Sequence, residues 1–339
     1  MVSIKDVAKR CGVSVATVSK ALNDCSDISS ATKLRVKRIA DEMGYFPNLQ
    51  AKALKTSKTK TIGIIYSNRL GNGLKQVYFS SIIESFKSAI EEDGYDLIFI
   101  GSRMSEEKKY TYYEHCKHRN VDGVLVACSD FYDSSICQLL RSELPVVVID
   151  FFSKRDYSVC SDNRQGMRDI LEYVYDMGHR KIGYIYGDTS QITTVRLDTF
   201  TETMKQLGVP VVFHYVKQGR YNDIRLAQKL TDDMLSLYDP PTCIIMPDDV
   251  SALGSFIAAR DRNLRIPDDL SVVGYDGIPF TQISGPGLTT VYQDTDEMGK
   301  RAAELLLSRI RGEEISEVRM HTMVETQLIK GHTVKKMTI

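Results

Sequence analysis

From Thr61 onward, short apolar runs alternate with helix-length segments, and this alternation limits the fold more than any other feature of the chain. Most of the runs are almost continuously apolar, as expected of strands that are buried on both faces. The alternation predicts parallel, doubly wound α/β sheets with right-handed crossovers. The predicted strands are 61–67, 95–102, 121–128, 145–151, 181–187, 211–216, 242–248 and 270–276. The predicted helices are 77–93, 105–119, 133–142, 163–178, 194–207, 222–238 and 249–263.

These strands are too many for one simple sheet of this kind, so we expect two similar lobes that divide near residues 160–163. The segment 288–310 adds a strand and a helix, and 321–329 adds a last strand. The predicted first lobe comprises residues 61–161 and 291–322, and the predicted second lobe comprises 162–290 and 323–339.

The first 43 residues carry the punctuation of three short helices. Ser3 and Asp6 form an acidic variant of the capping box, Gly12 ends the first helix, and Ser14 caps the second. A short turn that contains glycine joins these two helices, and this is the geometry of a helix-turn-helix. A generic fragment of a helical bundle is the alternative.

The formal net charge of zero conceals a charge difference between the two parts of the chain. Residues 1–60 carry 12 Lys and Arg against 5 Asp and Glu, whereas the remainder carries 32 basic and 39 acidic residues. A basic segment joined to an acidic body indicates a module for binding a polyanion on a carrier that does not bind one.

The cysteine content and the absence of long apolar runs limit where the protein works. Seven cysteines without a C-x-x-C pair argue against a disulfide framework and a zinc knuckle. The N-terminal sequence MVSIKDVAKR has no apolar core of a signal peptide, and no run approaches the roughly 20 apolar residues of a membrane helix. We therefore expect a cytoplasmic protein with no membrane contact.

Five motifs carry a family resemblance. The segments IKDVAKRCGVSVATVSKALN (4–23) and TKLRVKRIADEMGYFPNLQAKALK (32–55) resemble the DNA-binding end of repressors of the LacI/GalR family. DMGHRKIGYIYG (176–187), IPDDLSVVGYDGIPF (266–280) and PGLTTVYQDTDEMGKRAAELLL (286–307) resemble later signatures of that family. Several motifs in the same order are far more specific than one.

The resemblance implies an all-α helix-turn-helix domain in residues 1–46 and a hinge helix and linker in 47–60. It also implies that the two-lobed, doubly wound parallel α/β body is similar to the periplasmic binding proteins, with a ligand between the lobes.

The resemblance assigns DNA contacts to the second helix and its surroundings. The positions that match the family's base contacts are Val15, Ala16 and Lys20. For Val15, packing in the core of the domain is the alternative role. Lysine cannot make the planar bidentate contact that arginine makes with guanine. The positions that match phosphate contacts are Ser14, Thr17, Ser19, Asn23 and Thr32. A helix cap alone would also explain Ser14.

The resemblance also implies a hinge helix, and the matching residues are Ala51, Lys52, Leu54 and Lys55. In the family, a leucine of this helix is wedged between base steps in the minor groove, and Leu54 occupies the matching position. A plain interdomain linker is the alternative reading of this segment.

The resemblance and the strand-end rule both indicate an effector site. Asp150, Asp248 and Asp276 end predicted strands, and Arg196 lies near the start of a helix. Carboxylates with one arginine suit a polyhydroxylated ligand. The additional candidates are Tyr78, Phe79, Tyr221 and Phe280 as apolar walls and Arg103 as a further cation. Asp248 replaces the asparagine that is usual in the family, and a strand-end aspartate can instead cap a helix.

We therefore expect a transcription repressor that binds a pseudo-palindromic operator in double-stranded DNA as a homodimer and senses a small, sugar-like effector. No catalytic motif, metal site or cofactor is predicted. The alternative is a sugar-binding protein or an enzyme of two-lobed fold with no regulatory role on DNA. The sequence leaves open which effector is bound and whether it releases or promotes DNA binding.

The predicted wedge can be tested by Leu54→Ala. Loss of the wedge removes contacts that form only on bent, specific DNA, so binding to the operator should weaken more than binding to random duplex. Gel-shift titrations on both duplexes measure this ratio. Equal losses on the two duplexes contradict the wedge role.

Overall fold

The computed structural model describes residues 2–45, 58–67, 73–101, 110–283 and 287–337. The chain forms two compact units, residues 1–60 and 61–339. No helix among the described residues is long and apolar enough to cross a membrane.

The first unit, the head, is a three-helix domain. Its helices are α1 (Ile4–Cys11), α2 (Val15–Leu22) and α3 (Ser30–Glu42). A complete capping box of Ser3 and Asp6 begins α1, and Gly12 ends it in the left-handed conformation with φ of 65°. The buried residues that hold the three helices together are Val7, Ala8, Cys11, Val18, Ala21, Val36 and Ala40. The predicted helix-turn-helix is confirmed.

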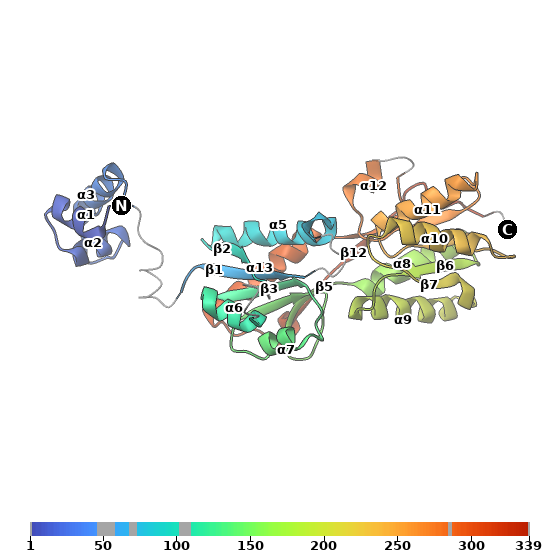
Figure 1. The fold of residues 1–339 in the computed structure, drawn as a ribbon, viewed down its shortest axis with the longest axis horizontal. Coiled ribbons are helices and arrows are strands. Elements are labelled where there is room, and N and C mark those ends of the chain that lie inside the picture. Colours follow the sequence, from blue (N-terminus) through green and yellow to red (C-terminus); the bar gives the residue numbers. More distant parts are fainter. Residues whose placement is uncertain (1, 46–57, 68–72, 102–109, 284–286, 338–339) are drawn as a thin grey trace. The chain divides into compact units, whose positions relative to one another are not determined.

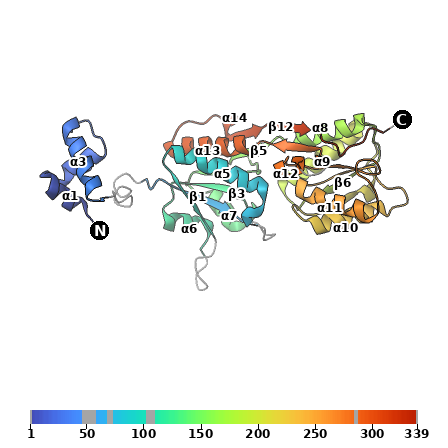
Figure 2. The same ribbon diagram turned by 90° about the horizontal axis from the view of Figure 1, so that it is seen from above.

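The first lobe of the second unit is built on a six-stranded parallel sheet with the order β11-β5-β4-β3-β1-β2. Its strands are β1 (Thr61–Tyr66), β2 (Asp96–Phe99), β3 (Gly123–Cys128), β4 (Val146–Ile149), β5 (Tyr157–Ser161) and β11 (His321–Val324). Its helices are α5 (Val77–Glu92), α6 (Tyr112–Arg119), α7 (Ser134–Leu140), α13 (Thr295–Arg311) and α14 (Glu317–Met320), with a short 3-10 helix η1 (Gly73–Lys75). Helices α5 and α13 lie side by side in both views (Figures 1 and 2).

Successive residues of these strands belong to different cores. Ile64 packs into the core with α5 and α13, whereas Ile65 packs into the core with α6 and α7. Because neighbouring side chains in a strand point to opposite faces, a sheet covered on both sides needs continuous apolar runs. This is the reason why the strands of this lobe do not alternate with polar residues.

The second lobe repeats the design on a four-stranded parallel sheet with the order β7-β6-β8-β9. Its strands are β6 (Ile182–Tyr186), β7 (Val216–Gln218), β8 (Cys243–Ile245) and β9 (Ser271–Val273). Its helices are α8 (Asn163–Asp176), α9 (Gln191–Gln206), α10 (Ile224–Leu235), α11 (Asp249–Asp261) and α12 (Pro279–Ile283), with a 3-10 helix η2 (Phe213–Tyr215). Two further cores cover its two faces. The predicted doubly wound α/β body with two lobes is confirmed.

The chain passes between the lobes three times. It leaves the first sheet after β5, returns between β10 (Thr290–Gln293) and α13, and leaves again between β11 and β12 (Thr326–Ile329). Strands β10 and β12 pair with each other in antiparallel register. The lobes are therefore joined by three short connections, two of which contain the paired strands.

Three details of the predicted strand pattern are wrong. Strand β5 was not predicted, because its sequence YSVCS lacks a continuous apolar run. The predicted strand 211–216 begins with exposed residues and becomes η2, and only Val216–Gln218 pairs with β6. The predicted last strand divides into β11 and β12 in different sheets, so the predicted lobe boundary after residue 322 falls inside β11.

The division of the chain into two compact units predicts the result of a truncation at Lys58. Among the described residues, the core of the head is formed by head residues alone. The remaining body should therefore keep its cooperative unfolding and its ligand binding but lose DNA binding. Thermal unfolding and gel shifts with duplexes selected by the full chain measure these properties. A truncated body that still binds those duplexes contradicts the assignment of DNA binding to the head.

Candidate DNA-binding surface and ligand cavity

The start of α2 presents small and apolar side chains to solvent. Val15 is 40% exposed and lies outside the core of the head, which removes the alternative of core packing. Ala16 is also exposed. Ser14 caps the helix, since its Oγ accepts a hydrogen bond of 3.0 Å from the Thr17 amide. The cap holds the first turn in place while its side chains stay accessible.

The polar residues around α2 that are candidates for DNA contact have hydrogen-bond or ion-pair partners within the head. Lys20 is exposed and forms an ion pair with Asp27. Asn23 donates from Nδ2 to the Ser19 carbonyl over 2.7 Å. The hydroxyl of Thr32 lies 2.9 Å from that of Ser29, the cap of α3. The predicted hinge residues Ala51, Lys52, Leu54 and Lys55 lie outside the described residues.

A cavity of about 950 Å³ lies between the two lobes of the body. Its polar lining comes from the carboxyl ends of strands in both sheets, where parallel sheets place their ligands. Asp150 follows β4, Asp276 follows β9, and Gln293 ends β10. The lining also includes Tyr78, Phe79, Arg196 and Tyr221.

Arg196 is the central cation of this cavity and is only 4% exposed. Its Nε donates to Asn163 Oδ1 over 2.7 Å, and one terminal nitrogen donates to the Pro247 carbonyl over 3.1 Å. The guanidinium lies 3.5 Å from the centre of the Tyr275 ring. A guanidinium has five N–H donors, so the protein contacts leave donors for a ligand.

Asp150 presents a carboxylate oxygen that has no hydrogen-bond partner. Its Oδ2 accepts from the Tyr78 hydroxyl over 2.7 Å, whereas its buried Oδ1 accepts from no described group. Burial raises the pKa of Asp150, and the hydrogen bond from Tyr78 opposes this shift. The backbone of Asp150 has φ of 55°, a left-handed conformation that is rare for non-glycine residues and frequent at functional sites.

Asp276 and Gln293 form a second polar pair. Gln293 Nε2 donates to Asp276 Oδ1 over 2.7 Å, and the buried Oε1 of Gln293 has no partner among the described groups. Burial, followed by the charge of Asp248, raises the pKa of Asp276 well above its usual value. Asp276 also has a positive φ, 106°. Two residues that line the cavity thus each carry a buried acceptor atom that no described group satisfies.

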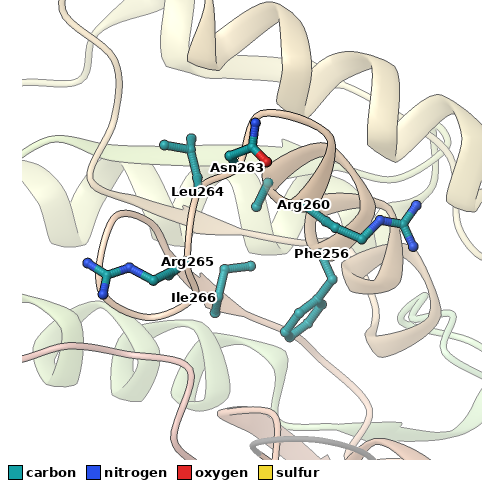
Figure 3. A pocket seen from close by; sticks show the side chains of 7 residues that line it. Phe256, Arg260, Asn263, Leu264, Arg265 and Ile266 are labelled. Carbon is teal, nitrogen blue, oxygen red and sulfur yellow. The ribbon is translucent and has the colours of Figure 1, made fainter.

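A second hollow, of about 410 Å³, lies at the end of α11 (Figure 3). Phe256 and Ile266 contribute apolar surface, but the guanidinium groups of Arg260 and Arg265 point away from each other. Without convergent polar groups it lacks the main property of a specific ligand site. Among the described residues there is also no group of His, Cys, Asp and Glu that could hold a metal ion.

Comparison with known proteins identifies the family. Residues 3–48 match the bacterial regulatory proteins of the lacI family, and residues 171–334 match the periplasmic binding protein-like domain. The repressor PurR of Klebsiella pneumoniae (strain 342) is 33% identical over 328 residues, which cover 95% of this chain and 94% of PurR. PurR of Vibrio parahaemolyticus is 31% identical over 99% of this chain and its own full length. This chain belongs to the LacI family.

Solved structures agree with this assignment. The lac repressor dimer bound to operator and the anti-inducer ONPF matches with a TM-score of 0.83 and 25% identity, over 98% of this chain and 99% of that one. The regulator CelR in complex with cellobiose matches with a TM-score of 0.67 and 25% identity, over 98% of this chain and all of CelR. As a LacI-family transcriptional regulator, the protein has a DNA-binding domain and a ligand-binding domain. It is not an enzyme.

Two of the predicted effector residues do not line the cavity. Asp248, at the position where the LacI family usually has asparagine, caps α11 by accepting from the Ser251 amide over 2.7 Å. Its other oxygen accepts from the Asn222 amide over 2.8 Å, which fixes the turn beside Tyr221. Phe280 is 59% exposed on α12. The structure therefore gives Asp248 the role of a cap, and Arg103 lies outside the described residues.

Sequence reasoning missed other residues of the cavity. Gln293 was not predicted, although it ends the run TTVYQ and the strand-end rule that selected Asp150 would have found it. Phe131 and Phe151 stack at 4.2 Å with an angle of 11° and form an aromatic wall with Tyr132. No sequence pattern indicated this wall, because its members belong to two loops that meet only in the fold.

Asp249 is buried at the start of α11 and holds the second lobe to the strand β10. Its carboxylate accepts from the hydroxyl of Thr290 over 2.5 Å and from the Ile278 amide over 2.8 Å. A third donor, the hydroxyl of Thr281, lies at 3.1 Å. Burial outweighs these hydrogen bonds and raises the pKa of Asp249 to about 7.

This pKa predicts a pH dependence of stability. The folded protein holds the proton of Asp249 more tightly than the unfolded chain, so the contribution of Asp249 to the free energy of unfolding should fall as pH rises from about 4 to 7. A shift from 3.8 to about 7 corresponds to at most about 4 kcal/mol. Asp249→Asn should remove this part of the slope in urea unfolding followed by circular dichroism. The control is Asp233→Asn on the exposed face of α10, and equal slopes in both variants contradict the prediction.

Proposed function

We propose that this protein is a homodimeric repressor of a pseudo-palindromic operator, with its DNA affinity controlled by a neutral, hydroxyl-rich effector in the interlobe cavity. The proposed effector is a sugar or a sugar derivative. The proposal depends mainly on one observation: Asp150 and Gln293 line the same cavity as Arg196, and each carries a buried acceptor atom that has no partner among the described groups. Buried polar groups are normally hydrogen-bonded, so these atoms favour a ligand that donates hydrogen bonds.

The charges of the lining favour a ligand without negative charge. Four carboxylates line the cavity against two arginines, Arg196 and Arg220. The carboxylates are those of Asp130, Asp150, Asp188 and Asp276. Each of these carboxylates that is ionised would repel a phosphorylated ligand strongly, because the site has a low dielectric constant. Hydroxyl groups instead supply donors for the carboxylates and acceptors for the arginines.

Aromatic side chains cover much of the remaining wall. Tyr78, Phe79 and Tyr221 stand near the buried polar groups, and Phe131, Tyr132 and Phe151 form the aromatic wall described above. Aromatic faces bind the apolar faces of rings. The complex of CelR with cellobiose shows that one relative of the same overall fold takes a sugar.

The dimer is proposed from the size of the head. Three helices in about 40 residues make a small interface with DNA, and a two-fold dimer would double the phosphate contacts and bind two half-sites. The lac repressor, which this chain resembles over nearly its whole length, binds operator as a dimer. We also propose that the lobes act as two subdomains, with the last boundary after Val324 instead of residue 322.

Effector binding would be coupled to DNA binding through the lobes. A ligand that contacts Asp150 in one lobe and Arg196 in the other stabilises one arrangement of the two. If the dimer binds DNA better or worse in that arrangement, the ligand changes the affinity for operator in the same sense. Gel shifts with and without ligand therefore measure directly whether the ligand strengthens or weakens the binding of operator.

The experiment is a thermal-shift screen of the full chain with neutral mono- and disaccharides and their phosphorylated counterparts. A neutral sugar that binds the folded state raises the melting temperature, and its phosphate ester should not. The same sugar should change operator affinity by roughly 5- to 150-fold in gel shifts. If only phosphorylated compounds stabilise the protein, the proposed effector class is wrong. A monomer in sedimentation at working concentrations contradicts the dimer.

A matched pair of variants localises the effect. Gln293→Ala removes an acceptor and should weaken sugar binding about tenfold, as expected for a hydrogen bond in a buried site. Gln327→Ala removes an exposed side chain of the paired strand β12 and should leave binding unchanged. Equal sugar affinity in the two variants would remove Gln293 from the site.

A further inference from the structure

The exposed face of α2 carries a charge pair that joins it to the following turn. Lys20 lies one helical turn after the exposed Ala16, and its ammonium group forms an ion pair with the carboxylate of Asp27. The two side chains are 51% and 52% exposed. The hydrogen bond from Lys20 lowers the pKa of Asp27, so both partners are charged at neutral pH. The pair therefore presents a donor and an acceptor side by side to solvent.

A second ion pair of the head provides a contrast. Asp24 accepts from Lys37 of α3 over 2.7 Å, and its carbonyl accepts from Lys33 over 3.0 Å. None of these groups belongs to α2. The turn thus holds two acidic residues of similar exposure, and of these two carboxylates it is that of Asp27 that pairs with a side chain of α2, the helix that presents the candidate base contacts.

The edges of base pairs in the major groove differ in a way that such a pair can detect. Guanine presents the acceptors N7 and O6 beside the N4 donor of its cytosine, whereas an A·T pair places a donor between two acceptors. An ammonium group has three donors, so Lys20 can contact guanine while it keeps Asp27. The carboxylate of Asp27 can then accept from cytosine N4. A lysine alone would be attracted to any phosphate.

We propose that Lys20 and Asp27 bind one G·C base pair in each half-site as a single donor–acceptor unit, which makes Asp27 a specificity-determining residue. This inference rests on the proposed function, because it requires α2 to face the bases. The carboxylate has two effects in this arrangement. It restricts the position of the lysine, and it repels the phosphates and base-edge acceptors of mismatched DNA.

The test selects binding sites from random duplex with the full chain and with Asp27→Asn. Asp27→Asn should reduce the preference for G·C over A·T at one position of each half-site by about five- to tenfold, the lower end of the range for loss of a good base contact. Asp24→Asn is the matched control, since it changes the net charge equally on the same turn. Both variants should bind random duplex roughly two- to fivefold more tightly, because each removes a surface carboxylate from a basic domain.

Further variants separate the possible outcomes. Asp27→Glu keeps the carboxylate and should keep the preference, which separates the effect of charge from damage to the fold. If Asp27→Asn and Asp24→Asn select the same sites with the same affinity, Asp27 has no role in specificity. If Lys20→Ala leaves the G·C preference intact, α2 does not face the bases. In that case the proposed function is wrong on this point. In the Lys20→Ala background, Asp27→Asn should relax the preference no further.

Discussion

A single buried guanidinium holds together the acidic edge of the ligand cavity. Arg196 contacts the start of α8 through Asn163, the end of β8 through Pro247 and the end of β9 through the ring of Tyr275. A buried charge is tolerated only when it is paired and hydrogen-bonded. The positive charge of Arg196 opposes the rise in the pKa of Asp150 and of Asp276 that burial causes. Without it, these carboxylates would form an uncompensated acidic cluster at the junction of three elements.

The position of this cluster follows from the topology. All strands in the two main sheets run parallel, so polar residues that end different strands meet at one edge of each sheet. The two edges face the same cavity, and the chain crosses between the lobes three times. Asp150 and Asp276 both adopt positive φ at this edge, a conformation that neighbouring structure must impose. Conformational strain and unsatisfied acceptors are thus concentrated where a ligand would make its contacts.

The sequence was most informative where a local rule is sufficient. The capping box of Ser3 and Asp6 and the left-handed Gly12 follow from short-range chemistry, and the helices of the head were predicted from them. Strands such as Val146–Ile149 were recognised because burial on both faces needs a continuous apolar run. The rule failed for Tyr157–Ser161, where serines are interspersed with apolar residues and yet become buried between β4 and β11.

By itself, the sequence determined the architecture, the family and most of the polar residues at strand ends, since each depends on spacing along the chain. Only the tertiary structure decided which of those residues share a cavity. Asp248 and Asp276 satisfy the same sequence rule, but Asp248 turns to cap α11 and to hold Asn222, whereas Asp276 meets Gln293 from a distant strand. The same is true of Lys20 and Asp27, which are partners because a turn brings them together. The physical reason is that a side chain's role depends on the donors and acceptors within about 3 Å of it, and in this fold many of those come from segments far apart in the sequence.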